Sequence, residues 1–236
     1  MRPMSASPRF ELEPILAALA AHDEVEVVGR GPQLIEWDAR DFADELAALR
    51  ASDELDRAVL AALGPRPELW LGLPQHVALQ WEAELAAFHE GPVGCLGGLC
   101  MRSLLDAWAL RDDRDWRPPA VPEGCEQAVL LDIDDYHGNG DFTIAVVEDG
   151  RLRLHYCDGH VFFPLHVEPL RLFRVGLQAL GWPHWQLLFC GRHEDPRYHA
   201  RCYLDPMCAA LARWLPGEPR PELLAAIADW RALNPL

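Results

Sequence analysis

The chain contains no lysine: all 21 basic residues among its 236 residues are arginine, and Thr143 is its only threonine. This bias is typical of a high-GC bacterial genome rather than of a particular function. No apolar run reaches the ~18 residues that a membrane-spanning helix needs, and residues 1–8 lack the apolar stretch of a secretory signal. These absences favour a soluble, cytoplasmic protein with no membrane partner.

Positive charge is also scarce, because 37 acidic residues face those 21 arginines and the formal net charge is −16. Such a surface repels a phosphate backbone, which argues against a nucleic-acid partner. The same charge would steer a basic protein partner toward the chain. A simpler interpretation, which stays open, is that the acidity only keeps the protein in solution.

Half of the residues are hydrophobic, with nine tryptophans and eight phenylalanines, which excludes a disordered chain. Seven cysteines occur, none of them in a Cys-x-x-Cys pair. In a cytosolic protein disulfides are rare and thiols are commonly buried, so most of these cysteines are expected in the core.

The middle of the chain predicts an antiparallel meander. Alternating or continuous apolar patterns predict strands over residues 127–133, 142–148 and 151–156, separated by a polar turn at 134–141 and an Asp149-Gly150 turn. An apolar run over 161–165 follows. The stripe of Leu170, Phe173, Leu177 and Leu180 predicts an amphipathic helix over 169–180 that covers the sheet.

Flanking segments are mostly predicted to be helical, over residues 9–22, 39–63, 74–88, 102–110, 205–215 and 221–233. Alternation at 24–28 and 33–37 predicts an N-terminal hairpin, and 191–201 is predicted to be a charged loop. The pattern favours one α+β domain over 1–236, with a helix-rich part (1–90), a sheet core (91–190) and C-terminal helices (191–236).

Two polar or glycine-rich segments invite chemical interpretations that their spacing does not support. Gly94–Cys100 has neither Gly-Lys-Ser/Thr nor Gly-x-Gly-x-x-Gly spacing, so we expect a tight turn that another backbone approaches closely. The acidic segment Asp132–Asp141 lacks the terminal glutamate and flanking helices of a calcium loop, and is better explained as a turn. We therefore predict no cofactor and no metal.

Histidine and cysteine leave an enzymatic alternative open. His155, Cys157, His160, Cys190 and His193 are residue types that zinc accepts, but no second pair has finger-like spacing. No nucleophile elbow or papain-like cysteine context occurs. A hydrolase that uses His and Cys or a metal is thus an alternative without an assigned catalytic residue.

The order of elements over about residues 91–189 resembles the SUKH superfamily. Residues 97–108 are similar to that family's glycine-plus-apolar segment before a short helix ending in Trp. Residues 138–142 resemble its Gly-Asp-aromatic entry to a central strand, and residues 148–155 and 170–180 resemble its next strand and closing helix. The family is related to a yeast regulator of cell-wall synthesis, and many bacterial members are immunity proteins of toxin systems.

The resemblance implies a non-enzymatic protein that binds and neutralises a toxin, possessing an antiparallel sheet covered by helices. Exposed carboxylates would steer a basic toxin domain, and aromatic or arginine side chains would anchor it. An intracellular regulator or scaffold is a second non-enzymatic alternative. The acidic residues expected to contact the partner are Asp112, Asp113, Asp115, Asp134, Asp135, Glu194 and Asp195.

Overall fold

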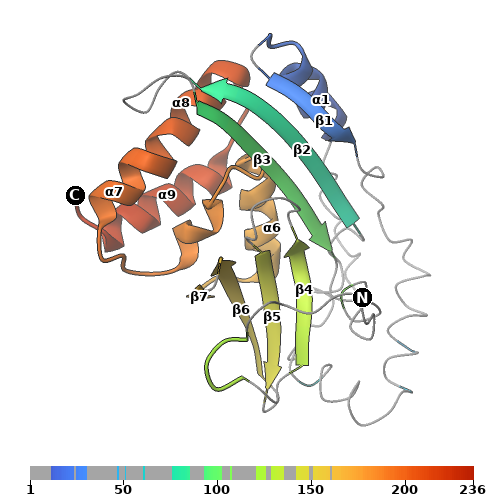
Figure 1. Ribbon diagram of the computed structural model, residues 1–236, viewed down its shortest axis with the longest axis vertical. Coiled ribbons are helices and arrows are strands. Elements are labelled where there is room, and N and C mark those ends of the chain that lie inside the picture. Colours follow the sequence, from blue (N-terminus) through green and yellow to red (C-terminus); the bar gives the residue numbers. More distant parts are fainter. Residues whose placement is uncertain are drawn as a thin grey trace, which may run out of the picture.

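Within the part of the chain that the structure describes, seven strands form one antiparallel sheet in which each strand pairs with the next one along the chain (Figure 1). A computed structural model describes residues 12–23, 25–30, 76–85, 93–102, 121–125, 129–135, 142–148, 151–159 and 161–236, with four single alanines between them. The strands are β1 (Val25–Arg30), β2 (His76–Leu85), β3 (Val93–Arg102), β4 (Val129–Asp135), β5 (Phe142–Glu148), β6 (Arg151–Asp158) and β7 (Val161–Leu165).

Among the helices that the structure describes with bounds, α1 (Leu12–Ala20) precedes the sheet in sequence and the others follow it. These are α6 (Pro169–Gln178), a 3₁₀ helix η1 (Trp185–Phe189), α7 (Pro196–His199), a π-helical turn η2 (Ala200–Leu204), α8 (Asp205–Trp214) and α9 (Pro221–Leu233). In Figure 1, α7 to α9 lie together on one side of the strands. The predicted α+β class with an antiparallel meander is therefore confirmed.

The meander consists of two groups of strands joined at one place. The β1–β2–β3 and β4–β5–β6–β7 ladders are extensive, whereas β3 and β4 share a single pair of Cα partners, Met101 and Asp134, among the residues described. The buried carboxylate of Asp134 strengthens this junction. It accepts hydrogen bonds from the Cys100 N–H (3.0 Å) and from Gln186 Nε2 (3.1 Å).

Most of the core lies between the sheet and the C-terminal helices. Three tryptophan rings mark its centre: Trp81 of β2 lies 5.5 Å from Trp182 and 5.2 Å from Trp214, measured between ring centroids. Strand β5 is buried on both faces, because Ala145 and Val147 join this core while Ile144 and Val146 join a smaller cluster on the opposite face. A run of apolar residues without alternation is typical of such a strand.

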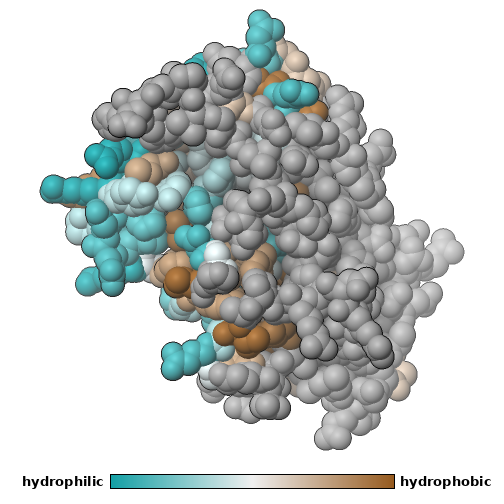
Figure 2. All heavy atoms as spheres, viewed as in Figure 1, coloured by the Kyte–Doolittle hydropathy of each residue, from teal (hydrophilic) through white to brown (hydrophobic). Residues whose placement is uncertain are grey.

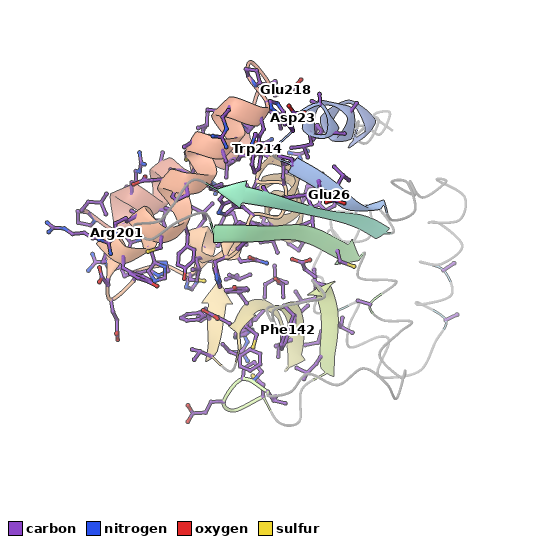
Figure 3. All side chains as sticks on the ribbon, turned by 45° about the horizontal axis from the view of Figure 1, so that its top comes forward. Asp23, Glu26, Phe142, Arg201, Trp214 and Glu218 are labelled. Carbon is purple, nitrogen blue, oxygen red and sulfur yellow. The ribbon has the colours of Figure 1, made fainter. Side chains whose placement is uncertain are left out.

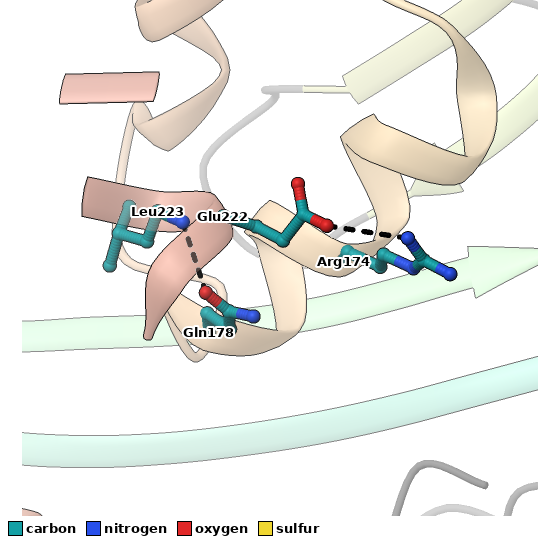
Figure 4. A network of polar contacts seen from close by, with 4 residues as sticks. All are labelled: Arg174, Gln178, Glu222 and Leu223. Atoms are coloured by element: carbon teal, nitrogen blue, oxygen red, sulfur yellow. Dashed lines mark hydrogen bonds and ion pairs between the residues drawn. The ribbon is translucent and has the colours of Figure 1, made fainter. Parts of the chain in front are cut away.

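Helix α6 covers the sheet with the stripe predicted from its sequence. Phe173, Leu177 and Leu180 are buried, and Leu170 packs against the core at its margin. Polar contacts fix α6 against α9: Arg174 pairs with Glu222 at 3.3 Å, and Gln178 Oε1 accepts a hydrogen bond from the Leu223 N–H at 3.0 Å (Figure 4). The Gln178 side chain thereby satisfies one of the N–H groups that lack an intrahelical partner at the start of α9.

Several predicted elements agree with the structure. Strand β5 has the predicted bounds, β4 and β6 each run two residues beyond theirs, and α8 and α9 fall within the predicted ranges. The β4 extension takes up part of the predicted polar turn, with a shift of register between Asp132 and Asp134. Helix α1 lies inside the predicted range, and its following turn is held by His22, whose Nε2 donates to the Trp214 carbonyl at 2.7 Å.

Three predictions in the flanking parts are wrong. The helix predicted over 74–88 is strand β2, which pairs with β1 in antiparallel fashion. The glycine-rich segment is strand β3 instead of a turn. The predicted charged loop at 191–201 contains α7 and the start of the π turn. Residues 33–37 and most of the predicted helices at 39–63 and 102–110 lie outside the described residues; the exceptions are single alanines and Arg102, which ends β3.

Candidate functional site

The turn after α6 carries three residues with left-handed backbone angles, and it sets up the candidate site. Leu180 (φ 55°), Gly181 (φ 61°) and His184 (φ 59°) lie within five positions. The Leu180 N–H donates to the Leu177 carbonyl, and the Gly181 N–H donates to the Gly176 carbonyl. These two hydrogen bonds are the pair that defines a Schellman motif at a helix C-terminus. Non-glycine residues adopt this conformation at an energetic cost, so the surrounding contacts must hold Leu180 and His184 in place.

Those contacts come from strands β2 and β3. The Trp81 indole N–H donates to the Leu180 carbonyl at 2.7 Å, and the Gly98 N–H donates to the Gly181 carbonyl at 2.9 Å. A Cβ at Gly97 would lie 2.0 Å from the Trp81 ring, and one at Gly181 would lie 2.0 Å from the Gly98 carbonyl oxygen. The glycines of β3 thus permit the close backbone approach that the sequence predicted, although within a strand.

A helix begins again at Asp195, whose side chain accepts a hydrogen bond from the Tyr198 N–H at 3.0 Å. Proline at the first helical position, here Pro196, suits such a start. The helix then widens into the π turn Ala200–Leu204 before α8 continues it. Pro206 follows this turn; in a regular α-helix its ring would meet the Cys202 carbonyl, and the wider turn relieves that conflict.

These elements bring together six ring-bearing side chains, which we call the His–Tyr cluster: His184, His193, His199, Tyr156, Tyr198 and Tyr203. The closest ring centroids are those of His193 and His199 (4.2 Å) and of His184 and Tyr203 (4.5 Å). The Tyr156 hydroxyl lies 2.8 Å from His184 Nδ1, within hydrogen-bonding distance. His193 Nε2 donates to the Leu187 carbonyl at 3.1 Å, and its ring rests on Trp230 at 5.6 Å.

Burial disfavours charge on three members of the cluster, His193, His199 and Tyr203. Desolvation lowers the pKa of His193, against a smaller opposite effect of its hydrogen bond to Leu187. Desolvation also lowers the pKa of His199, followed by repulsion from His193 and His184. The pKa of Tyr203 is raised to about 12, mainly by burial and then by the Tyr198 hydroxyl. Burial therefore favours the uncharged forms of His193, His199 and Tyr203.

A polar surface lies above this cluster, and we call it the α7–π surface: Glu194, Asp195, Arg197, Tyr198 and Arg201, all of them exposed. Tyr198 is 46 % exposed, while its ring packs edge-on against His199 and Tyr203. Figure 3 shows Arg201 at the outer edge of the C-terminal helices, away from Asp23 and Glu218, which lie near α1. The region of α7 to α9 is mainly hydrophilic in Figure 2.

The structure distributes the seven predicted partner-binding residues unevenly. Glu194 and Asp195 lie together on the α7–π surface. The prediction for Asp134 is wrong: the residue is 1 % exposed, because both carboxylate oxygens are engaged inside the junction of β3, β4 and η1. Asp135 ends β4, with its side chain outside the described part. The remaining three, Asp112, Asp113 and Asp115, lie outside the described residues.

The enzymatic alternative gains no support from the geometry. His155 and Cys157 face the smaller cluster on one side of the sheet, whereas Cys190 and His193 belong to the opposite side. Within the described part of the chain, no three His, Cys, Asp or Glu side chains are placed to share a metal ion. Burial raises the pKa of Cys190 to about 12 and also raises that of Cys208, which opposes a reactive thiolate at either position.

Sequence reasoning missed most of this site, namely Arg197, Tyr198, His199, Arg201 and Tyr203. Two signals were available: Asp195-Pro196 is a typical helix start, and aromatic residues recur shortly after it. The π turn and the contact with His184 and Tyr156 had no local signal, since both depend on distant segments.

Comparison with protein-family models, with curated proteins and with solved structures finds no match for this chain. Within the described residues, no helix has both the length and the apolar character required to cross a membrane.

Proposed function

We propose that this protein acts by binding another protein through the α7–π surface, as an immunity protein does when it occludes a toxin. The observation that carries the proposal is the half-exposed ring of Tyr198, flanked by Arg197 and Arg201 and packed on the half-buried rings of His199 and Tyr203. Tyrosine and arginine are enriched among the residues that dominate binding energy at protein interfaces. These ring contacts already restrict the Tyr198 side chain in the unbound protein, which lowers the entropy lost when a partner holds it.

The negative charge of the chain indicates that the proposed partner is basic. The net charge of −16 attracts a basic domain over long range, and Glu194 and Asp195 add carboxylates beside the aromatic anchor. Arg197 and Arg201 would pair with carboxylates or backbone carbonyls of the partner at close range. The proposal places the protein in the cytoplasm, where it would meet a toxin that acts inside the cell.

The test uses the purified full-length chain and the purified product of a neighbouring toxin-like gene, with affinity measured by calorimetry. We expect Tyr198→Ala to weaken binding by at least about tenfold, as for an interface residue of hot-spot type. Leu224→Ala is the matched control, because Leu224 is also a large exposed side chain (61 %) but lies on α9. The association rate should fall as salt is added.

Two results would contradict the proposal. If the wild-type chain does not bind the toxin-like protein, the immunity role is wrong. If it binds but Tyr198→Ala and Leu224→Ala have equal effects, the α7–π surface is not the contact site.

A further inference from the structure

We propose that the His–Tyr cluster is a proton-operated switch, which loosens the segment Gly191–Leu204 when the pH falls below neutrality and so weakens partner binding at the α7–π surface. The second half of this inference rests on the function proposed above, whereas the first half concerns the protein alone. The cluster has the three properties that such a switch requires. Two titratable groups lie side by side, an added proton finds no hydrogen-bond acceptor, and the segment opens more easily than its surroundings.

The paired groups come from different elements that pack against one another. His193 lies in the loop after η1, His199 ends α7, and their ring centroids are 4.2 Å apart. His184, which precedes η1, adds a third imidazole that repels positive charge on His199. Two adjacent imidazolium ions disfavour each other, so the pair takes up its protons in coupled steps.

The other groups that face His199 do not remove this repulsion. Asp195, at the start of α7, and Asp158, at the end of β6, favour the charged form, but burial and the two histidines have the larger effect, and the pKa of His199 is lowered. Tyr198 and Tyr203 contact the ring from α7 and the π turn as uncharged groups. On the α9 side, Trp230 offers His193 an aromatic face.

An added proton has no acceptor in the closed arrangement. His199 Nδ1 is buried without a hydrogen-bond partner, and an imidazolium must donate from both of its nitrogens. His193 already donates from Nε2 to the Leu187 carbonyl, so its second proton would enter at Nδ1. Protonation of His199 therefore places a donor on its buried Nδ1, which opening of the segment would expose to water.

The direction of the pH effect follows from the lowered pKa values. A histidine exposed by opening titrates near 6.5, and in the closed form His193 and His199 titrate below that value. Their contribution to the closed form is complete above pH 6.5 and is lost as the pH falls toward the folded pKa values.

The segment is also the part of this region with the weakest regular structure. Helix α7 has four residues, the π turn has five, and Gly191 (φ 83°) begins the segment. Its main tether is Asn234, whose side chain accepts from the His193 N–H at 2.8 Å and donates to the Gly191 carbonyl at 3.0 Å. Short elements with few tethers open at lower free energy than the core does.

Hydrogen exchange of the purified full-length chain, read by mass spectrometry at pH 7.5 and 5.5 and corrected for intrinsic rates, tests the switch without any partner. We expect protection of residues 192–204 to fall by about tenfold at the lower pH, the limit for one histidine that titrates near 6.5 in the open form and stays uncharged in the closed form, because pH 5.5 lies one unit below 6.5. Protection of β5 and β6 should change much less. Any loss of stability of the whole protein at the lower pH, including one caused by His155 on β6, would also lower protection in these two strands.

Two variants distinguish an effect of the His–Tyr cluster from an effect of histidine protonation elsewhere in the protein. His193→Gln leaves one imidazole of the pair, so the fall in protection should shrink to less than about threefold if charge repulsion drives the opening. His166→Gln changes an exposed histidine outside the cluster and should behave as wild type does. Equal protection of 192–204 at both pH values, equal falls in β5 and β6, or an unchanged fall in His193→Gln would each overturn the switch.

Calorimetry with the toxin-like protein at the same two pH values tests the link to binding. We expect weaker binding at pH 5.5 for the wild-type chain and a smaller change for His193→Gln. Equal affinities at both pH values would overturn the link. Absence of binding at pH 7.5 would instead overturn the proposed function, and the exchange result would still decide the switch.

Discussion

Replacement of Gly181 by alanine should be far more damaging than the same change at other glycines with left-handed backbone angles. Gly181 and Gly159 share a φ of 61°, and Gly217 has a φ of 85°, but an added Cβ would meet nothing within 4 Å at Gly159 or Gly217. At Gly181 the Cβ would lie 2.0 Å from the Gly98 carbonyl oxygen, a backbone atom that cannot rotate away. The three positions thus separate backbone strain from steric conflict.

The magnitudes can be worked out for each position. Backbone strain costs about 1–2 kcal/mol for alanine in the left-handed region, which is the whole expected effect at Gly159 and Gly217. At Gly181 the conflict with β3 adds about 1–3 kcal/mol of overpacking, and loss of the 2.9 Å bond from the Gly98 N–H to the Gly181 carbonyl adds about 1 kcal/mol. The expected total is about 3–6 kcal/mol, a large part of the ~5–15 kcal/mol by which proteins are stable.

Urea denaturation followed by circular dichroism measures these differences as free energies of unfolding. At about 2–4 °C per kcal/mol for a chain of this size, thermal melting should show the same order, with Gly181→Ala lowest. Equal losses at Gly181 and Gly159 would refute the reasoning, because they would mean that the turn after α6 does not press against β3.

Three further changes test other parts of the fold. Asp134→Ala should destabilise the protein by about 2–5 kcal/mol, since it leaves the Cys100 N–H and Gln186 Nε2 without their buried acceptor; a loss below ~1 kcal/mol by urea denaturation would contradict this role. Trp81→Phe should cost about 2–4 kcal/mol, because the Leu180 carbonyl loses its donor and the tryptophan cluster loses volume, and an unchanged unfolding midpoint would exclude that contact. Burial and then Arg153 lower the pKa of His155, so this residue favours folding above pH 6.5 and loses that effect as the pH falls. His155→Phe should therefore lose less stability between pH 7.5 and 5.5 than wild type does, and equal losses would exclude His155 as a source of acid sensitivity.

Helix and strand periodicity explain both the success and the main failure of sequence reasoning on the fold. Strand β5 and helix α6 carry patterns with one interpretation each, and the structure confirms both. Strand β2 does not: the spacing of Val77, Trp81 and Leu85 fits a helix, but the intervening Leu79 and Ala83 complete a strand alternation. A spacing of four is shared by the two periods, and pairing of β2 with β1 and β3 decides between them.

The candidate site was harder to predict than the fold. Glu194 and Asp195 were found because exposed charge in a polar segment is visible in composition. Asp134 was misassigned for the same reason, since a carboxylate in a polar stretch carries no local sign that distant donors will bury it. The His–Tyr cluster contains residues from β6, from the turn before η1, from the loop after η1, from α7 and from the π turn, so no single sequence window contains it.

The sequence by itself determined the α+β class, the antiparallel order of the central strands and the apolar face of α6, because each depends on a local period of side chains. Tertiary structure alone decided that a glycine-rich segment becomes strand β3, that Leu180 and His184 take left-handed angles, and that three histidines meet. Each of these outcomes depends on atoms contributed by segments far apart in the chain, whose approach fixes conformations that local preference would not select.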